Sequence, residues 1–293
     1  MKKSGIFILL LTLFVACGNH SQQADAYGNF EAEEVLVSSE SNGKIEALWI
    51  KEGDQIQKNK VVALMDTTMP WLQLNELDAQ KQKVHASLAQ MDAQLAIYKQ
   101  QKDNLLTDQK RIERLLDSGA STQKQLDDIN GAILLIDKQM LAAVSQKQAI
   151  AKELGVIQAK KRLLDEQLNK CYVKNPVQGT VLEKYAEAGE ITAAGRPLYK
   201  IAPMDQLILR AYVSGSQLHR LKTGNTCQVR IDKGTEAYET YEGTLIWIAP
   251  QAEFTPKIIQ TKEERVHMVY AIKVQVPNKG SLKIGMPGEV IFE

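Results

Sequence analysis

The side chains that could carry acid–base or metal chemistry are few and lie far apart in the sequence. No two of the histidines, His20, His85, His219 and His267, have the short spacing of zinc ligands, and the three cysteines form no Cys-x-x-Cys pair. The chain has no glycine-rich phosphate-binding loop and no Gly-x-Ser-x-Gly nucleophile motif. We therefore predict no catalytic centre, no metal site and no bound cofactor.

Two of the cysteines, Cys171 and Cys227, fall in different predicted modules. This separation favours two buried free thiols. A disulfide is the alternative if the protein works in an oxidising compartment.

The first residues have the layout of an export signal. Two lysines precede an apolar run, residues 6–16, which is too short to span a bilayer. The run ends in Phe14-Val-Ala-Cys17, which resembles a bacterial lipoprotein cleavage site. The resemblance implies that residues 1–16 are removed and that acyl chains on Cys17 anchor the protein to a membrane leaflet. The alternative is an ordinary signal peptide followed by an incidental cysteine.

The composition permits packed domains and argues against some partners. The chain has 293 residues, of which 44% are hydrophobic, so more than one core can form. The formal net charge is +1, which gives no reason to expect nucleic acid as a partner. We predict a polar, extended tether over residues 17–32.

A heptad pattern dominates the middle of the chain. Apolar residues recur at steps of three, four or seven from Leu77 to Leu116 and again from Leu126 to Leu168, with no proline between them. Four seam positions are polar instead: Lys102, Gln109, Lys147 and Lys161. Polar seam residues weaken packing but fix the register. We predict an antiparallel helical hairpin over residues 70–170, with arms of about 65–70 Å.

The predicted turn of the hairpin spans residues 117–122. Gly119 suits a left-handed helix stop. Thr122 followed by Gln125 matches a capping box that starts the second helix.

Two β segments on either side of the hairpin repeat one another. Gly43-Lys-Ile45 lies ten residues before Gly53, and Gly179-Thr-Val181 lies ten residues before Gly189. Residues 60–65 then align with residues 196–201. A repeat of this kind predicts a pseudo-symmetric unit, built from residues 33–69 and 171–203.

These repeats resemble the halves of a biotinyl/lipoyl-type flattened barrel, and Asn175-Pro-Val-Gln-Gly-Thr-Val181 resembles the opening of that family's second half, with Asn175 in place of alanine. In true carriers the halves meet at a turn that bears a modified lysine, whereas the first half here ends in Leu64-Met-Asp66. Halves split by a coiled coil are similar to the HlyD-type membrane fusion proteins, the periplasmic adaptors of bacterial export systems. The resemblance implies an elongated, mixed α and β fold: a coiled-coil hairpin inserted between the halves of a lipoyl-like domain, followed by a small β-barrel.

The barrel is expected over residues 204–293. Residues 207–213, 226–231, 243–248, 266–276 and 288–292 alternate or run apolar as strands do. Residues 217–221 are predicted to form a short helical turn, and Gly285-Met-Pro-Gly-Glu-Val290 is similar to the closing strand of the adaptor family. The charged run Lys262–Val266 is predicted to be a solvated loop, with a subunit or transporter contact as the alternative.

The hairpin tip carries the pattern by which adaptors of this family meet an outer-membrane channel. In that pattern a leucine follows an arginine by four residues and a serine follows seven later, and Arg111, Leu115 and Thr122 have this spacing. The resemblance implies that Arg111 and Leu115 contact the helical ends of a TolC-like channel. The alternative is that Leu115 flanks the seam, Arg111 is a solvated charge and Thr122 only caps a helix.

The resemblance also implies the function. We expect a non-catalytic adaptor, lipid-anchored on the periplasmic side of the inner membrane of a Gram-negative envelope and assembled as a hexameric ring. It would link an inner-membrane transporter to the channel for export or efflux. An ABC-type transporter is favoured over RND and MFS types, because the sequence shows no fourth, membrane-proximal domain after the barrel. Candidates for a gate loop in the lipoyl-like domain are Gln178, Glu187 and Glu190.

Two other functions remain open from the sequence. One is a biotinyl/lipoyl-type carrier subunit, against which the missing lysine turn and the export signal both argue. The other is a coiled-coil lipoprotein that bridges the layers of the envelope without transport.

Overall fold

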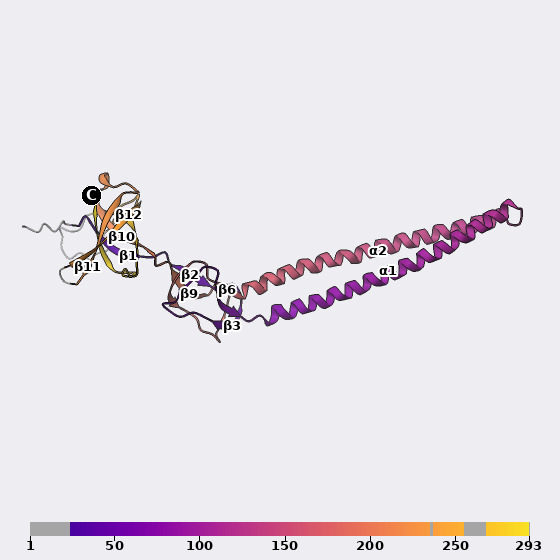
Figure 1. Cartoon of the computed structure of the whole chain (residues 1–293), viewed down its shortest axis with the longest axis horizontal. Helices are drawn as coiled ribbons and strands as arrows, with labels where there is room; N and C mark the ends of the chain where they lie inside the picture. Colours follow the sequence, from indigo (N-terminus) through magenta and orange to yellow (C-terminus); the bar gives the residue numbers. More distant parts are fainter. Residues whose placement is uncertain (1–23, 235–236, 255–267, 293) are drawn as a thin grey trace, which may run out of the picture.

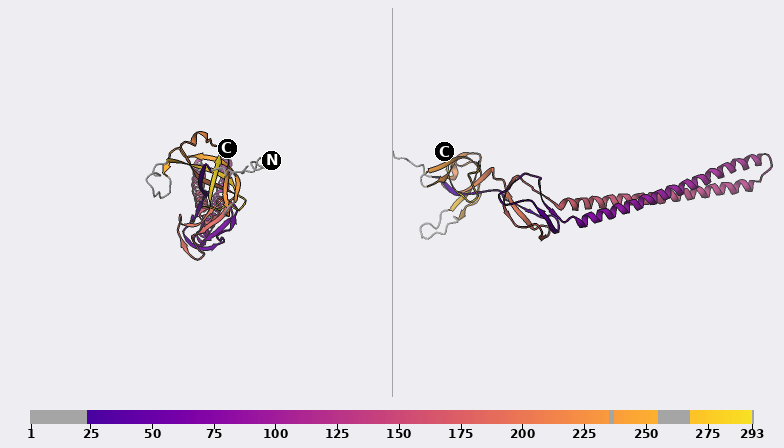
Figure 2. Two further views of the ribbon diagram at one scale, coloured as in Figure 1. Left: turned by 90° about the vertical axis from the view of Figure 1, so that its left-hand side faces the viewer. Right: turned by 60° about the horizontal axis from the view of Figure 1, so that its bottom comes forward.

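The computed structural model describes residues 24–234, 237–254 and 268–292. The export signal, Cys17 and the Lys262–Val266 run lie outside the described residues. The molecule is elongated, with a β-barrel at one end, a smaller β domain in the middle and a helical hairpin at the other end (Figures 1 and 2). The predicted mixed α and β architecture is confirmed.

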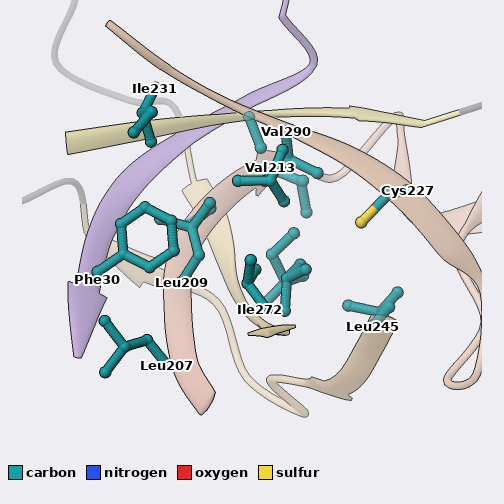
Figure 3. Close-up of a cluster of buried hydrophobic side chains, with 14 of the residues drawn as sticks. Phe30, Leu207, Leu209, Val213, Cys227, Ile231, Leu245, Ile272 and Val290 are labelled. Atoms are coloured by element: carbon teal, nitrogen blue, oxygen red, sulfur yellow. The ribbon is translucent and has the colours of Figure 1, made fainter. Parts of the chain in front are cut away.

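The barrel is an antiparallel sheet in the order β10-β1-β15-β11-β12-β14-β13, and it closes because β10 also pairs with β14. Its elements are β1 (Ala26–Glu31), β10 (Gln206–Ser214), the 3-10 turn η1 (Leu218–Arg220), β11 (Thr226–Lys233), β12 (Ala237–Ile248), β13 (Glu253–Phe254), β14 (Met268–Pro277) and β15 (Pro287–Phe292). Alternate residues of these strands fill the interior, among them Phe30, Leu209 and Ile272 (Figure 3). The short turn predicted at residues 217–221 is confirmed by η1.

The predicted tether over residues 17–32 is wrong for residues 26–31, which form β1. This strand lies between β10 and β15 and buries Ala26 and Phe30. Its third inward residue is Gly28, where a Cβ atom would lie 1.9 Å from the Arg210 carbonyl oxygen. Since two of the three inward residues are small, the stretch shows no apolar alternation, and only pairing with distant strands makes it a strand.

The middle domain consists of two four-stranded sheets, β2-β9-β7-β4 and β6-β5-β3-β8. The strands are β2 (Val35–Ser38), β3 (Gly43–Leu48), β4 (Gln55–Ile56), β5 (Val61–Met65), β6 (Tyr172–Lys174), β7 (Gly179–Lys184), β8 (Ile191–Thr192) and β9 (Pro197–Ala202). Each sheet takes two strands from each sequence repeat. The two halves therefore share one core and depend on each other to form it.

Backbone hydrogen bonds show the pseudo-symmetry directly. The Gly53 N–H donates to the Val181 carbonyl at 2.9 Å, and 136 residues later the Gly189 N–H donates to the Ile45 carbonyl at 2.7 Å. Both glycines have positive φ angles, +88° and +97°, which other residues resist. The predicted repeat and its matched glycine turns are confirmed.

Asn175, the departure from the carrier pattern, is a buried polar residue with its partners in place. Its side-chain oxygen accepts a hydrogen bond from the Tyr199 hydroxyl at 2.8 Å, and its amide donates to the Gln57 carbonyl at 3.1 Å. A buried amide is tolerated only when it is satisfied in this way. Asn175 thus ties the second half of the domain to the first.

The hairpin consists of α1 (Thr68–Asp117) and α2 (Gln123–Lys170), of 50 and 48 residues. At 1.5 Å per residue each helix is about 70–75 Å long. The helices follow β5 and precede β6, which pair with Leu64 opposite Tyr172. They therefore take the place of the turn that bears the modified lysine in carrier domains.

Candidate docking site at the hairpin tip

The four polar seam positions predicted from the sequence are each paired across the hairpin. The four pairs are Asp78–Lys161, Asp92–Lys147, Lys102–Asp137 and Gln109–Asn130. In every pair the two residue numbers add up to 239, so the four pairs share one antiparallel register. If one helix slid along the other, these polar side chains would lose their partners and face other residues of the seam. That loss opposes sliding. The position of the tip relative to the base is thereby fixed.

The base of the hairpin is held by both packing and backbone contacts. Leu77, Val84 and Ile157 are buried where the helices leave the β domain. The Met65 N–H donates at 2.8 Å to the carbonyl of Cys171, the C-cap residue that follows α2. The start of α1 and the end of α2 are thus held by the β5–β6 pair, and the tip lies at the far end of the molecule (Figure 1).

The turn is built as the sequence predicts. Gly119 has a φ angle of +74°, and the Ala120 N–H donates to the Leu115 carbonyl at 2.7 Å. The Gln125 N–H donates to the Thr122 hydroxyl at 3.4 Å, and the Thr122 N–H donates to the Gln125 side chain at 3.0 Å. This is a complete capping box, so the predicted cap is confirmed.

Of the three predicted docking residues, Arg111 and Leu115 lie in the last turns of α1, and Thr122 is the N-cap of α2. The Arg111 side chain is 64% exposed and forms an ion pair with Asp108, one turn back. Leu115 is 39% exposed although it is aliphatic. Thr122 uses its hydroxyl within the turn. Of these three residues, Arg111 offers a guanidinium and Leu115 an apolar side chain, a pair suited to a protein surface that has carboxylate or carbonyl acceptors beside an apolar pocket.

Sequence reasoning missed Asp108 as part of this site. The residue lies three positions before Arg111, a spacing at which opposite charges meet on a helix. It limits the directions that the Arg111 side chain can take. The i, i+3 spacing of Asp108 and Arg111 was the sequence signal that could have predicted this ion pair.

Of the three predicted gate-loop residues, Glu187 and Glu190 share one turn, in which the Glu190 N–H donates to the Glu187 carbonyl at 3.3 Å, whereas Gln178 lies apart from them. Gln178 lines an open cleft of about 750 Å³ where the two β domains meet, beside Asp205 and Lys279. Glu190 lies at the other end of the lipoyl-like domain, where its carbonyl accepts a hydrogen bond from Ile45, and Glu187 forms an ion pair with Lys184 at 2.6 Å. Gln178 is thus separated from Glu187 and Glu190, and a gate role for the three residues stays a prediction.

The two cysteines within the described residues are free and buried. Cys171 belongs to the core of the lipoyl-like domain and Cys227 to the barrel core. Burial raises the pKa of both thiols, that of Cys227 to about 11. Over the described ranges no cluster of three or more histidines, cysteines or carboxylates could hold a metal ion. No helix in those ranges is long and apolar enough to cross a bilayer.

Comparison with known proteins identifies the fold. No family model matches the sequence. The crystal structure of MacA from Actinobacillus actinomycetemcomitans aligns with 92% of this chain and 78% of its own, with a TM-score of 0.57 and 19% identity. The chain therefore shares the fold of MacA. The resemblance stated from the sequence is thus confirmed at the level of the fold.

Two curated relatives match most of this chain in sequence. A UPF0194 membrane protein of Yersinia enterocolitica is 28% identical over 333 residues, which cover 99% of this chain and 98% of that protein. Another from Acidithiobacillus ferridurans is 25% identical over 292 residues, which cover 89% and 84%. The similarity therefore extends over the barrel, the lipoyl-like domain and the hairpin together.

Proposed function

We propose that this protein is a periplasmic adaptor that connects an inner-membrane transporter to a TolC-like outer-membrane channel for export or efflux. The barrel end faces the transporter and the hairpin tip docks on the channel. The adaptor performs no catalysis. It holds the transporter in the inner membrane and the channel in the outer membrane in line with each other.

The observation that carries this proposal is the geometry of the hairpin. Two helices of 50 and 48 residues leave the body as one rod and place Arg111 and Leu115 on its free end, with their side chains exposed. The four paired polar layers keep the rod in one register. A long rod with a fixed register and an exposed leucine at its tip suits contact across a distance.

The part of the proposal that places the barrel next to the inner membrane rests on Cys17. An acylated Cys17 lies nine residues before β1, whose first residue is Ala26. At no more than about 3.5 Å per residue, this segment keeps the barrel within about 30 Å of the leaflet. The barrel is therefore the part of the molecule that meets the transporter, for which we propose the ABC type.

Photo-crosslinking from the tip tests the proposal. A photoreactive amino acid at Leu115, in intact cells of the native host, is expected to give an adduct with an outer-membrane channel. The same amino acid at His85, which is exposed near the base of α1, is the control and should give no such adduct. Membrane-bound protein with no channel adduct from Leu115 would favour a bridging scaffold over an adaptor.

A further inference from the structure

The outer wall of the barrel carries a groove of about 610 Å³, which we call the barrel groove. It crosses β10, β1, β15 and β11, four strands that follow one another in the sheet. Four of its lining residues stand in one row across these strands, because the strand register pairs each with the next: Tyr212, Tyr27, Glu289 and Arg230. The groove belongs to the barrel end of the molecule (Figure 1), so it is separate from the docking site at the hairpin tip.

The side of the groove formed by β10 and β1 is aromatic. Tyr27 lies directly opposite Tyr212 in the strand register, and paired strands are about 4.8 Å apart, so the two side chains are close neighbours. Val269 and Pro287 line the same groove and add apolar surface. Tyr27 is 55% exposed, and no other described residue forms a hydrogen bond or a cation–π contact with its side chain. A flat apolar group can therefore lie against this ring.

The side formed by β15 and β11 is acidic. Glu289 is the register neighbour of Tyr27, one strand away, and Asp232 follows Arg230 by two residues, on the same face of β11. In the described part of the chain neither carboxylate group has an ion-pair or hydrogen-bond partner. Arg230 is the one cationic residue that lines the groove within the described ranges, and its guanidinium lies 5.8 Å from the centre of the Tyr238 ring. One positive and two negative side chains leave the groove with a formal charge of −1.

The arginine beside the aromatic wall is neutralised within the barrel. The Arg210 guanidinium lies 6.0 Å from the centre of the Tyr212 ring and donates to both carboxylate oxygens of Glu253, at 3.1 and 3.2 Å. Because Glu253 compensates its charge, Arg210 adds little positive potential to the groove. Among the described residues, the groups that line the groove without a partner therefore include the Tyr27 ring and the two carboxylates.

We propose that the barrel groove binds an organic cation that contains an aromatic ring. The ring lies against Tyr27, whose aromatic face attracts positive charge, and the cationic group faces Glu289 and Asp232. One strand spacing of about 4.8 Å separates Tyr27 from Glu289, so a charge carried on the ring reaches both. An anion would meet two carboxylates, and a small inorganic cation would leave the apolar wall unused. The inference rests on the proposed function, and it names a class of compound that the export system carries.

Binding of two dyes with the same ring system tests the charge preference. Tetramethylrhodamine ethyl ester and fluorescein are both xanthene dyes, but the first is a cation and the second an anion at neutral pH. Fluorescence polarisation with the full-length protein in nanodiscs, after subtraction of empty nanodiscs, is expected to show saturable binding of the cationic dye alone. Equal binding of both dyes, or no saturable binding of the cationic dye, would overturn the proposal.

Substitutions on each side of the groove assign the binding to it. Tyr27→Leu should weaken binding of the cationic dye by about threefold or more, whereas Tyr27→Phe should retain it, since the ring and not the hydroxyl makes the contact. Asp232→Asn with Glu289→Gln should weaken binding about tenfold. Asp205→Asn with Glu242→Gln removes the same charge from exposed positions outside the groove and should have no effect. Unchanged affinity in both groove variants would place the dye elsewhere and contradict the proposal.

Retention of ethidium, an aromatic cation, tests the role in export. Cells that carry Tyr27→Leu should retain more ethidium than the wild type and as much as a deletion strain, while the channel adduct from Leu115 still forms. Normal ethidium export by Tyr27→Leu would contradict the cargo class.

The groove and the adaptor function can fail separately. Dye binding without the channel adduct keeps the groove and removes channel docking. The adduct without dye binding keeps the adaptor and removes the groove.

Discussion

The Lys102 ammonium donates to the Asp137 carboxylate at 2.7 Å across the hairpin, in a seam that is otherwise mostly apolar. The side chains are 32% and 43% exposed, so solvent screens the pair and its contribution to stability is small. Its importance lies in register, because a slip of one heptad would leave Lys102 without a carboxylate partner.

Substitutions of this pair should show how much it contributes to the stability of the hairpin, apart from its effect on the register. We expect a double-mutant cycle with Lys102→Ala and Asp137→Ala to give a coupling energy of about 0.2–1 kcal/mol, decreasing as salt is added. Lys102→Leu with Asp137→Leu should instead raise the unfolding midpoint, because an apolar layer replaces a polar one. Thermal unfolding followed by circular dichroism at 222 nm measures both. A lower unfolding midpoint for the leucine pair would show that the ion pair also stabilises the hairpin.

Substitutions at Thr122 should distinguish capping from channel contact. Thr122→Ala removes the capping hydroxyl and should destabilise the start of α2 by about 1 kcal/mol, whereas Thr122→Ser should restore it. Unfolding of the hairpin by circular dichroism measures the loss. If Thr122→Ala abolished transport while hairpin stability fell by no more than this, the hydroxyl would also contact the channel.

Leu115→Asp should abolish channel binding without destabilising the protein. The side chain is already exposed, so the unfolding free energy should change by less than about 0.5 kcal/mol. A buried apolar contact with the channel would be lost together with transport. Export activity in a deletion strain, with protein abundance measured in parallel, checks this. His85→Asp is the matched exposed control, and normal export by Leu115→Asp would contradict docking through this residue.

Two glycine substitutions should act in opposite directions. Gly28→Ala places a Cβ atom 1.9 Å from the Arg210 carbonyl oxygen and should destabilise the barrel by about 3 kcal/mol or more. Gly131→Ala lies in α2 with open space around it and should stabilise the hairpin by about 0.5–1 kcal/mol. Tryptophan fluorescence and circular dichroism at 222 nm follow the two changes. A stable Gly28→Ala barrel would mean that β1 does not lie against β10 as described.

The Cys227 thiol should give the barrel a pH-dependent stability. Burial raises its pKa from an ordinary 9.0 to about 11, so between these values the folded state holds a proton that the unfolded state has lost. The barrel should therefore lose stability as pH rises from 9 to 11, and Cys227→Ala should reduce this loss. Urea unfolding at pH 8, 9, 10 and 11 measures it. An equal loss in Cys227→Ala would assign the effect to other groups.

The long-period features of the fold could be predicted from the sequence, and the partners of individual side chains could not. The heptads from Leu77 to Leu168 indicate the hairpin because the period persists over many turns. The same pattern identifies Lys102 as a polar seam residue but does not say that Asp137 is its partner, since that depends on a register fixed in three dimensions.

The features that could not be predicted have similar causes. β1 could not be predicted because Ala26 and Gly28 fill inward positions without an apolar signal, and the strand depends on β10 and β15, far away in the sequence. Gln178 and Glu190 are close in sequence, but β7 runs between them and carries the chain to the other end of the domain. At the tip, sequence spacing predicted the cap at Thr122, and docking by Arg111 and Leu115 is a prediction that awaits the crosslink.

The nesting of the three modules has a consequence for how the chain folds. The hairpin is inserted in the lipoyl-like domain, and that domain is inserted in the barrel between β1 and β10. Hairpin contacts near the turn are local in sequence and form quickly, whereas β5 and β6 must otherwise close a loop of more than 100 residues. Once the hairpin has formed, it holds β5 next to β6, so that this long loop need not close by chance. The completed β domain then brings β1 next to β10 in the same way. The molecule should therefore fold from its innermost insertion outwards, with the barrel last.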